Sequence, residues 1–256
     1  MSNFGNQRTL PQRPSPAGQL VWGVVSTALL AGWIYWQMGA MAALGGVIGI
    51  FVHEYGHVLA INRAGMGPGR IHIIPFLGGA ASWKSPPDSE YTGALVALAG
   101  PAFGMVAAIP FIVIAKVTGE PMWLEAALFI SIINLLNLAP APPLDGSKVI
   151  GPVLARIHPM LERAALLAVG GLAIYWALSR HSYIFAAFVG ISILGSMGRG
   201  GIRPPSRPLT GGEQLSLVSF FAATVFMVLV TLQIIADGLG KDSPLDLLAQ
   251  LVQFHA

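Results

Sequence analysis

Long apolar runs separated by short polar segments dominate the chain. An α-helix needs about 17 to 25 apolar residues to cross the hydrocarbon core of a bilayer, and most of the runs approach or reach that length. The fifth and sixth runs are shorter, so we expect them to be tilted spans, thin spans or a re-entrant pair. The pattern predicts an all-α polytopic membrane protein with about six to seven transmembrane helices. The runs cover residues 20–37, 40–61, 91–117, 122–139, 164–179, 183–197 and 215–236.

The segments outside these runs have their own patterns. Residues 70–83 alternate in polarity and have glycines beside and within them, which predicts a small membrane-associated β-hairpin; a plain connecting loop is the alternative. Residues 1–19 are polar and Pro-rich, which predicts a disordered cytoplasmic tail and no cleavable signal. Residues 237–256 include an amphipathic segment that we expect at the membrane surface. The transmembrane domain is therefore predicted to occupy residues 20–236.

Composition agrees with a membrane protein and limits its partners. Hydrophobic residues make up 54% of the chain and charged residues 10%, against roughly 25% charged residues in soluble domains. The net charge of +3 comes from basic residues scattered between the apolar runs, so no basic stripe predicts nucleic-acid binding. The expected partners are the lipid bilayer and a membrane protein.

The distribution of Lys and Arg predicts the orientation of the chain. If the N-terminus is cytoplasmic, all but three of the 14 Lys and Arg residues fall on the cytoplasmic side. Cytoplasmic loops of membrane proteins carry an excess of these residues, so this orientation is favoured. We expect a multi-pass protein of a bacterial or archaeal cell membrane. The three exceptions are Lys116, Arg180 and Lys241.

A His-Glu-Tyr-Gly-His sequence, from His53 to His57, lies inside the second apolar run. On a helix the two histidines are one turn apart, with Cβ atoms about 5 to 6 Å from each other, which suits two ligands of one zinc ion. Glu54 is then free to act as a base. An uncompensated charge in hydrocarbon costs about 2.5 to 3.5 kcal/mol on insertion scales, so ionisable residues there usually have a function. An accidental match and a buried polar cluster between helices are the alternatives.

A catalytic zinc site needs a third protein ligand, and the sequence offers few candidates. The chain has no cysteine, which leaves His and carboxylate side chains. The second and fourth runs cross in the same direction, so Asp145, just beyond the fourth run, lies on the same side as His57. His72 is the alternative on that side, whereas Asp88 and Glu90 belong to a hydrophilic loop that we expect to be solvated. Asp145 is the predicted third ligand.

Three prolines interrupt the apolar stretch between Asn137 and Asp145. Proline removes a backbone donor and breaks a helix. Irregular backbone at membrane depth is tolerated only where it is buried in protein or lines a wet cavity. The stretch is therefore expected to line a site beside Asp145; a Pro-rich helix end without a site is the alternative.

These motifs resemble those of the site-2 proteases, a family of intramembrane zinc metalloproteases. Residues 53–57 match the family's H-E-x-G-H form, and residues 137–146 match its N-x-x-P-x-x-x-L-D-G element. Residues 75–80 look like its membrane-associated hairpin, and residues 98–101 resemble the Ala-Gly-Pro that opens the next span. The resemblance covers about residues 40–150, the expected core of the domain.

The chain departs from the family pattern a few residues after the Ala-Gly-Pro. Family members often carry Asn there, whereas this chain continues with Ala102, Phe103 and Gly104. Any polar role of that side chain is expected to be absent. Glycines one to two turns before His53 are expected to allow close helix packing against Gly100 and Gly104. These glycines are Gly45, Gly46 and Gly49.

The resemblance implies one Zn2+ per chain, bound by His53, His57 and Asp145. It implies that Glu54 activates a water molecule in the fourth coordination position, in agreement with the chemistry of catalytic zinc sites. It also implies that Asn137 donates a hydrogen bond to the tetrahedral oxyanion or to the substrate backbone. A hydrogen bond between helices is the alternative role of Asn137.

Hydrolysis of a transmembrane helix requires local unwinding, because the helix hides its own backbone groups. The hairpin is expected to pair with the unwound substrate by strand addition. Asn134, one turn before Asn137, is assigned a hydrogen bond between helices. Substrate contacts are expected from Gly78, Gly79, Pro140 and Pro143.

The function predicted from the sequence is intramembrane zinc endopeptidase activity on a transmembrane protein substrate. The alternative is a membrane transporter or scaffold without proteolytic activity, in which the metal site is vestigial. The presence of Glu54 favours the protease, since a structural zinc needs no base. The H-E-x-x-H spacing excludes the prenyl-protein proteases that use H-E-x-x-x-H. The sequence leaves the oligomeric state open.

Overall fold

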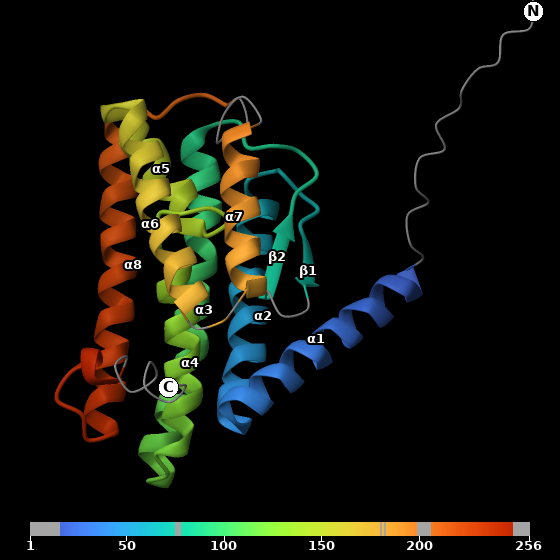
Figure 1. Cartoon of the computed structure of the whole chain (residues 1–256), viewed down its shortest axis with the longest axis vertical. Helices are drawn as coiled ribbons and strands as arrows, with labels where there is room; N and C mark the ends of the chain where they lie inside the picture. The colour runs from blue at the N-terminus through green and yellow to red at the C-terminus, as the bar shows by residue number, and fades with distance from the viewer. Residues whose placement is uncertain (1–15, 75–77, 180, 182, 199–205, 248–256) are drawn as a thin grey trace, which may run out of the picture.

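The computed structural model describes residues 16–74, 78–179, 181, 183–198 and 206–247. Within these ranges the chain forms eight α-helices and one antiparallel two-stranded sheet (Figure 1). The mostly helical fold and the hairpin agree with the prediction. The helices are α1 Pro16–Met38, α2 Ala40–Arg63, α3 Glu90–Thr118, α4 Met122–Asn137, α5 Asp145–Ile157, α6 Pro159–Ser179, α7 Tyr183–Gly198 and α8 Gly211–Gly238, and the strands are β1 Arg70–Ile74 and β2 Gly78–Ser82.

Four of the described helices, α2, α3, α6 and α8, are long and apolar enough to cross a membrane. They indicate a multi-pass membrane protein. The fifth apolar run was expected to be short, but α6 begins at Pro159 and so reaches spanning length. Its first five residues include Glu162 and Arg163, which the apolar pattern alone left out. The sixth run forms α7, which has 16 residues within the described ranges. The number of six to seven spans remains a prediction.

Helix α1 leans away from the other helices and meets them at its C-terminal end (Figure 1). There Leu30 and Ile34 pack in one buried cluster with Ala42 and Ile50 of α2. Helix α1 is described from Pro16, about a turn before the expected start of the first run. Residues 1–15 of the predicted tail lie outside the described residues.

Helix α2 packs against both α3 and α4, which places it at the centre of the molecule. Its glycines contact α4 closely, since a Cβ atom on Gly45 would lie 2.4 Å from the carbonyl oxygen of Ala126. The prediction that these glycines pack against Gly100 and Gly104 is wrong. A small residue in the sequence shows that a helix can be approached, but not which helix approaches it. The contacts with α4 are made by Gly45, Gly46 and Gly49.

The break between α4 and α5 falls where the three prolines predicted it. Helix α4 ends at Asn137, before the expected limit at residue 139, and α5 begins at Asp145. Helix α5 was not predicted. Its buried residues include Val149 and Val153, and it packs against α3, α6 and α8. The chain thus continues from α4 into a second helix, α5 (Figure 1), and Asp145 is the first residue of that helix.

The last three helices form the outer part of the bundle. Helix α8 packs against α3, α4 and α5, and residues such as Leu232 and Ile235 join the largest buried cluster. Helices α6 and α7 pack against each other through Leu166, Val189 and Ile193. Helix α6 is connected to the rest of the bundle through α5. Residues 248–256 of the predicted amphipathic segment lie outside the described residues.

The predicted hairpin between α2 and α3 is confirmed. Strands β1 and β2 are antiparallel, and the register pairs His72 with Ala80 and Ile73 with Gly79. Strand β1 lies against α1 and α2, and β2 lies against α2. The hairpin therefore lies beside the helix that carries the His-Glu-Tyr-Gly-His sequence.

Candidate metal centre

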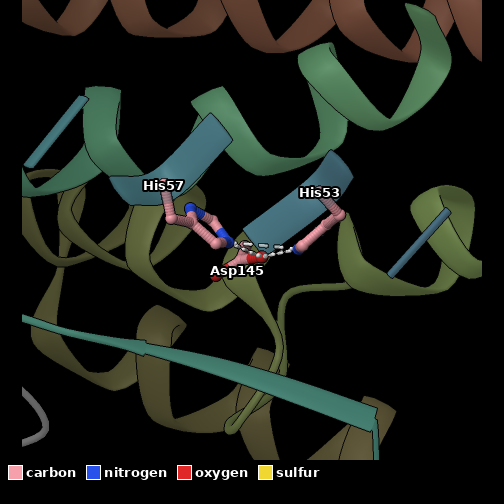
Figure 2. A group of neighbouring side chains, drawn as sticks. All are labelled: His53, His57 and Asp145. Atoms are coloured by element: carbon pink, nitrogen blue, oxygen red, sulfur yellow. Dashed lines mark hydrogen bonds and ion pairs between the residues drawn. The ribbon is translucent and has the colours of Figure 1, made fainter. Parts of the chain in front are cut away.

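The two histidines of α2 and the first residue of α5 meet inside the protein. Asp145 Oδ2 lies 3.1 Å from His53 Nε2 and 3.1 Å from His57 Nε2. The two Nε2 atoms are themselves 3.1 Å apart. All three residues are buried, and their side chains converge on one point in Figure 2. The fold thus brings together residues separated by 88 and 92 positions.

Each histidine has a partner on its other ring nitrogen. His57 Nδ1 lies 2.8 Å from the carbonyl oxygen of Val96 on α3. A carbonyl can only accept a hydrogen bond, so His57 Nδ1 carries a proton and donates it; in the neutral ring, Nε2 is then the atom with the lone pair. His53 Nδ1 lies 2.9 Å from the side-chain oxygen of Asn134 on α4, which accepts in the same way. Both Nε2 atoms therefore present lone pairs toward Asp145.

This arrangement fits a bound cation. Two imidazole nitrogens and a carboxylate oxygen converge at 3.1 Å from one another, and all three are atoms that can bind a metal ion. With bonds of about 2.0 to 2.2 Å, two ligands of a tetrahedral zinc lie roughly 3.3 to 3.6 Å apart. The observed triangle is close to one face of such a tetrahedron. The group His53, His57 and Asp145 can hold one metal ion.

The other oxygen of Asp145, Oδ1, is paired with the side chain of Lys148. Lys148 lies one turn along α5, and its Nζ donates a hydrogen bond to Asp145 Oδ1 at a distance of 3.0 Å. The Lys148 side chain is about half exposed, whereas Asp145 is buried. Asp145 Oδ2 is thereby left to face the two histidines. The carboxylate is oriented to offer one oxygen to a metal ion.

Glu54 lies beside this group without belonging to it. It is buried on α2, and its Oε2 atom has no hydrogen-bond partner among the described residues. Strand β2 covers it closely, since a Cβ atom on Gly79 would lie 2.4 Å from Glu54 Cγ. A buried carboxylate oxygen without a partner is costly in a folded protein, which indicates a site for a further ligand such as water.

Helix α3 approaches the histidines at a glycine. A Cβ atom on Gly100 would lie 2.4 Å from both Cε1 and Nε2 of His57, and 2.8 Å from Nε2 of His53. No side chain larger than hydrogen fits there without displacing a ring. Gly100 belongs to the Ala-Gly-Pro sequence noted above, so that motif has a direct steric function in this fold.

Two cavities meet at the site. The larger, of about 360 Å³, extends from His53, Glu54 and His57 past Lys148 to Glu90 at the start of α3. The smaller, of about 200 Å³, lies between α1, α2 and α4 and is lined mainly by apolar side chains. Four residues line both cavities, so the two spaces adjoin around the same groups. These residues are His53, Glu54, Gly79 and Asn137.

The remaining predicted site residues lie at different distances from this centre. Asn137 lines both cavities, and its Nδ2 donates to the carbonyl oxygen of Ile133 at 3.0 Å. Pro143 lines the larger cavity, but Pro140 lines a separate small space near α6. Gly78 pairs with Ile74 at the start of β2. His72, the alternative ligand, bonds Ser82 within the hairpin and does not join the metal-binding group.

The sequence assigned Asn134 a hydrogen bond between helices, and the structure confirms it. The bond joins α4 to α2, and its partner is the metal-facing histidine His53. The signal in the sequence was the presence of a second Asn one turn before Asn137. Nothing in the sequence distinguished a partner on a histidine from a partner on any other group of a neighbouring helix.

Comparisons with known proteins agree with this chemistry. A Mycobacterium tuberculosis protein named "Putative zinc metalloprotease Rip3" is 28% identical over 141 residues, which are 52% of this chain and 36% of the relative. A Synechocystis protein named "Putative zinc metalloprotease sll0528" is 26% identical over 175 residues, 62% of this chain and 45% of the relative.

An archaeal protein is similar as well. "Zinc metalloprotease MJ0392" of Methanocaldococcus jannaschii is 23% identical over 126 residues, 47% of this chain and 36% of the relative. The chain spans less than half the length of these relatives. No family model matches the chain, and no solved structure is significantly similar to it. The relatives are consistent with the resemblance to the site-2 proteases.

Proposed function

We propose that this protein is an intramembrane zinc endopeptidase that hydrolyses a peptide bond in a transmembrane segment of another membrane protein. The observation that carries the proposal is the convergence of His53, His57 and Asp145 on one point inside an apolar bundle, next to a buried Glu54. The names of the relatives support a zinc metalloprotease. Cleavage of membrane-embedded substrates places the protein in signalling or quality control.

The residues of the chain divide the chemistry among them. Two imidazoles and the Asp145 carboxylate hold the zinc, which when bound supplies a Lewis acid for water and for the scissile carbonyl. Glu54 takes the proton of the attacking water and passes it to the nitrogen of the leaving amine, so the proton balance closes. Asn137 uses one N–H on Ile133 and keeps a second donor for the oxyanion or the substrate backbone.

The hydrogen bonding of a helix supports an unwound substrate, because a transmembrane helix keeps its peptide groups in its own hydrogen bonds. Strand addition to β2 would give the freed groups new partners and would carry the extended chain past Glu54, which lies close to Gly79. Proline at Ile73 should disturb the hairpin and slow cleavage without releasing zinc; an unchanged rate would argue against strand addition.

The orientation in the membrane follows from the distribution of charge. We infer a cytoplasmic N-terminus, which puts the loops that join α2 to α3 and α7 to α8 on the cytoplasmic side. The larger cavity reaches Glu90 at that end of the bundle, so cleavage is expected near the cytoplasmic side. Topology reporters fused at Gly18 and Gly211 should both report the cytoplasm, and two external reporters would reverse the assignment.

Replacement of the base is the direct test of the proposed chemistry. Glu54→Gln should keep the zinc, because Glu54 is no ligand, and should lower cleavage of a single-span substrate by about 10²-fold or more. Glu125→Gln is the matched control, since Glu125 is an exposed carboxylate near the other end of the bundle. Zinc content and cleavage are measured on the same purified protein. Unchanged turnover in Glu54→Gln would exclude the protease mechanism, and a transporter predicts no cleavage by either form.

A further inference from the structure

We propose that Asn134 is a positioning residue for the metal centre. Its side chain holds the His53 ring so that Nε2 of His53 is turned toward the metal. The inference rests on the proposed zinc site and extends it to a residue outside the resembled motifs. Asn134 is fully buried on α4, and its side-chain oxygen lies 2.9 Å from His53 Nδ1.

A second hydrogen bond decides which way the amide points. Asn134 Nδ2 lies 2.8 Å from the carbonyl oxygen of Ile130, one turn earlier on the same helix. Only the NH2 end of the amide can donate to that carbonyl, so the oxygen end must face His53. The oxygen can only accept, and therefore His53 Nδ1 must carry the proton. The carbonyl of Ile130 thus fixes the amide, and the amide fixes the tautomer of His53.

The neighbouring helix makes room for this amide. A Cβ atom on Gly104 of α3 would lie 2.1 Å from Asn134 Oδ1 and 2.5 Å from Nδ2. Gly104 falls in the stretch where the resembled family often carries Asn and this chain does not. In this chain Asn134 of α4 supplies the polar side chain that α3 lacks. Its amide occupies the space that a side chain at position 104 would fill.

The two histidines are held in parallel ways from different helices. Val96 of α3 fixes His57 with a backbone carbonyl, which no side-chain substitution removes. Asn134 fixes His53 with a side chain, so this half of the arrangement can be tested by substitution. Outer partners of metal-bound histidines orient the ring, and their loss typically weakens metal affinity about 10- to 100-fold.

The test uses the full chain in detergent and measures zinc affinity by competition with a chelator. Asn134→Leu keeps the branched shape of the side chain without its hydrogen bonds and should weaken zinc binding about 10- to 100-fold. Asn134→Asp keeps an acceptor toward His53 but cannot donate to the carbonyl of Ile130, so it should lose less affinity than Asn134→Leu. The control is Ser131→Ala, at an equally buried position on α4 whose hydroxyl bonds only its own helix at Ala127; it should not change the affinity.

The absorption spectrum of the cobalt-substituted protein gives a second readout that does not depend on activity. Asn134→Leu should shift or broaden the cobalt bands, because His53 is free to rotate, while Asn134→Asp and Ser131→Ala should preserve them. If Asn134→Leu binds zinc within about twofold of the unsubstituted protein with unchanged cobalt bands, the positioning role is wrong. If Asn134→Leu does not fold, a folded Asn134→Ala that binds zinc within about twofold of the unsubstituted protein also overturns it. Failure of cleavage alone bears on the proposed function and not on Asn134.

Discussion

Helices α2 and α6 have the same mean hydropathy in their most apolar windows, 1.4, yet they are used in different ways. Half of the α2 window is buried, against 22% of the α6 window. Helix α2 packs against α3 and α4 and carries the ionisable residues of the metal centre. Helix α6 packs on α5 and α7 and exposes large apolar side chains such as Leu172 and Tyr175. Equal hydropathy therefore conceals two kinds of helix, one that builds a site and one whose large apolar side chains stay exposed.

The difference lies in where the small residues find partners. On α2, glycines bring the backbones of α3 and α4 close, which is how helices associate when lipid offers no hydrophobic driving force. Helix α6 has two glycines: a Cβ atom at Gly170 would meet only the flexible side chain of Ile193, and one at Gly171 would have no atom within 4 Å. The glycines of α2 differ in that Gly45 and Gly56 lie against backbone atoms of neighbouring helices.

The largest change in zinc affinity is expected from Gly100→Ala, at the glycine of α3 that lies against the histidines of α2. The new methyl group would press on His57 and His53 at 2.4 and 2.8 Å, and overpacking of this kind costs about 1 to 3 kcal/mol. Since about 1.4 kcal/mol is a factor of ten, zinc affinity should fall about 10- to 100-fold. Gly171→Ala is the matched control and should leave zinc affinity unchanged. Chelator competition on both variants makes the measurement, and equal affinities would erase the distinction between the two regions.

A smaller effect on zinc binding is expected at Gly79, where the hairpin covers the proposed base Glu54. In Gly79→Ala the methyl group would lie 2.4 Å from Glu54 Cγ, and the flexible Glu54 side chain can shift to relieve the clash. The zinc ligands are not touched, so zinc content should be retained while cleavage falls about 10- to 100-fold through misplacement of the base. Gly195→Ala on α7 enters open space and should leave both quantities unchanged. Loss of zinc in Gly79→Ala would show that β2 supports the metal ligands themselves.

The sequence predicted which residues meet at the centre better than it predicted their surroundings. His53, Glu54 and His57 stood out because ionisable residues are costly in an apolar run, and Asp145 followed from the direction in which each run crosses. The cost of burying a charge and the side of the membrane on which a run ends can both be read from the sequence without knowing which helices pack together. The prolines after Asn137 likewise predicted the break between two helices, because proline removes a backbone donor.

The features that were missed depend on contacts between distant segments. Helix α5 was not predicted because the prolines marked an end of helix and the following polar residues gave no apolar run. The role of Asn134 depends on His53, 81 positions away, and on the space left by Gly104. The partners of Gly45 and Gly49 depend on which neighbouring helix packs there. A single sequence carries no direct record of such pairings.

The central claim is that Asp145 completes a zinc site with the two histidines of α2, and zinc stoichiometry of the purified chain tests it most directly. The unsubstituted protein should hold one zinc ion per chain. Asp145→Ala should retain almost none after dialysis against a chelator, because two imidazoles alone are a weak site. His72→Ala should retain the full amount, since His72 lies in the hairpin and bonds Ser82. A full equivalent of zinc in Asp145→Ala, or its loss in His72→Ala alone, would contradict the account.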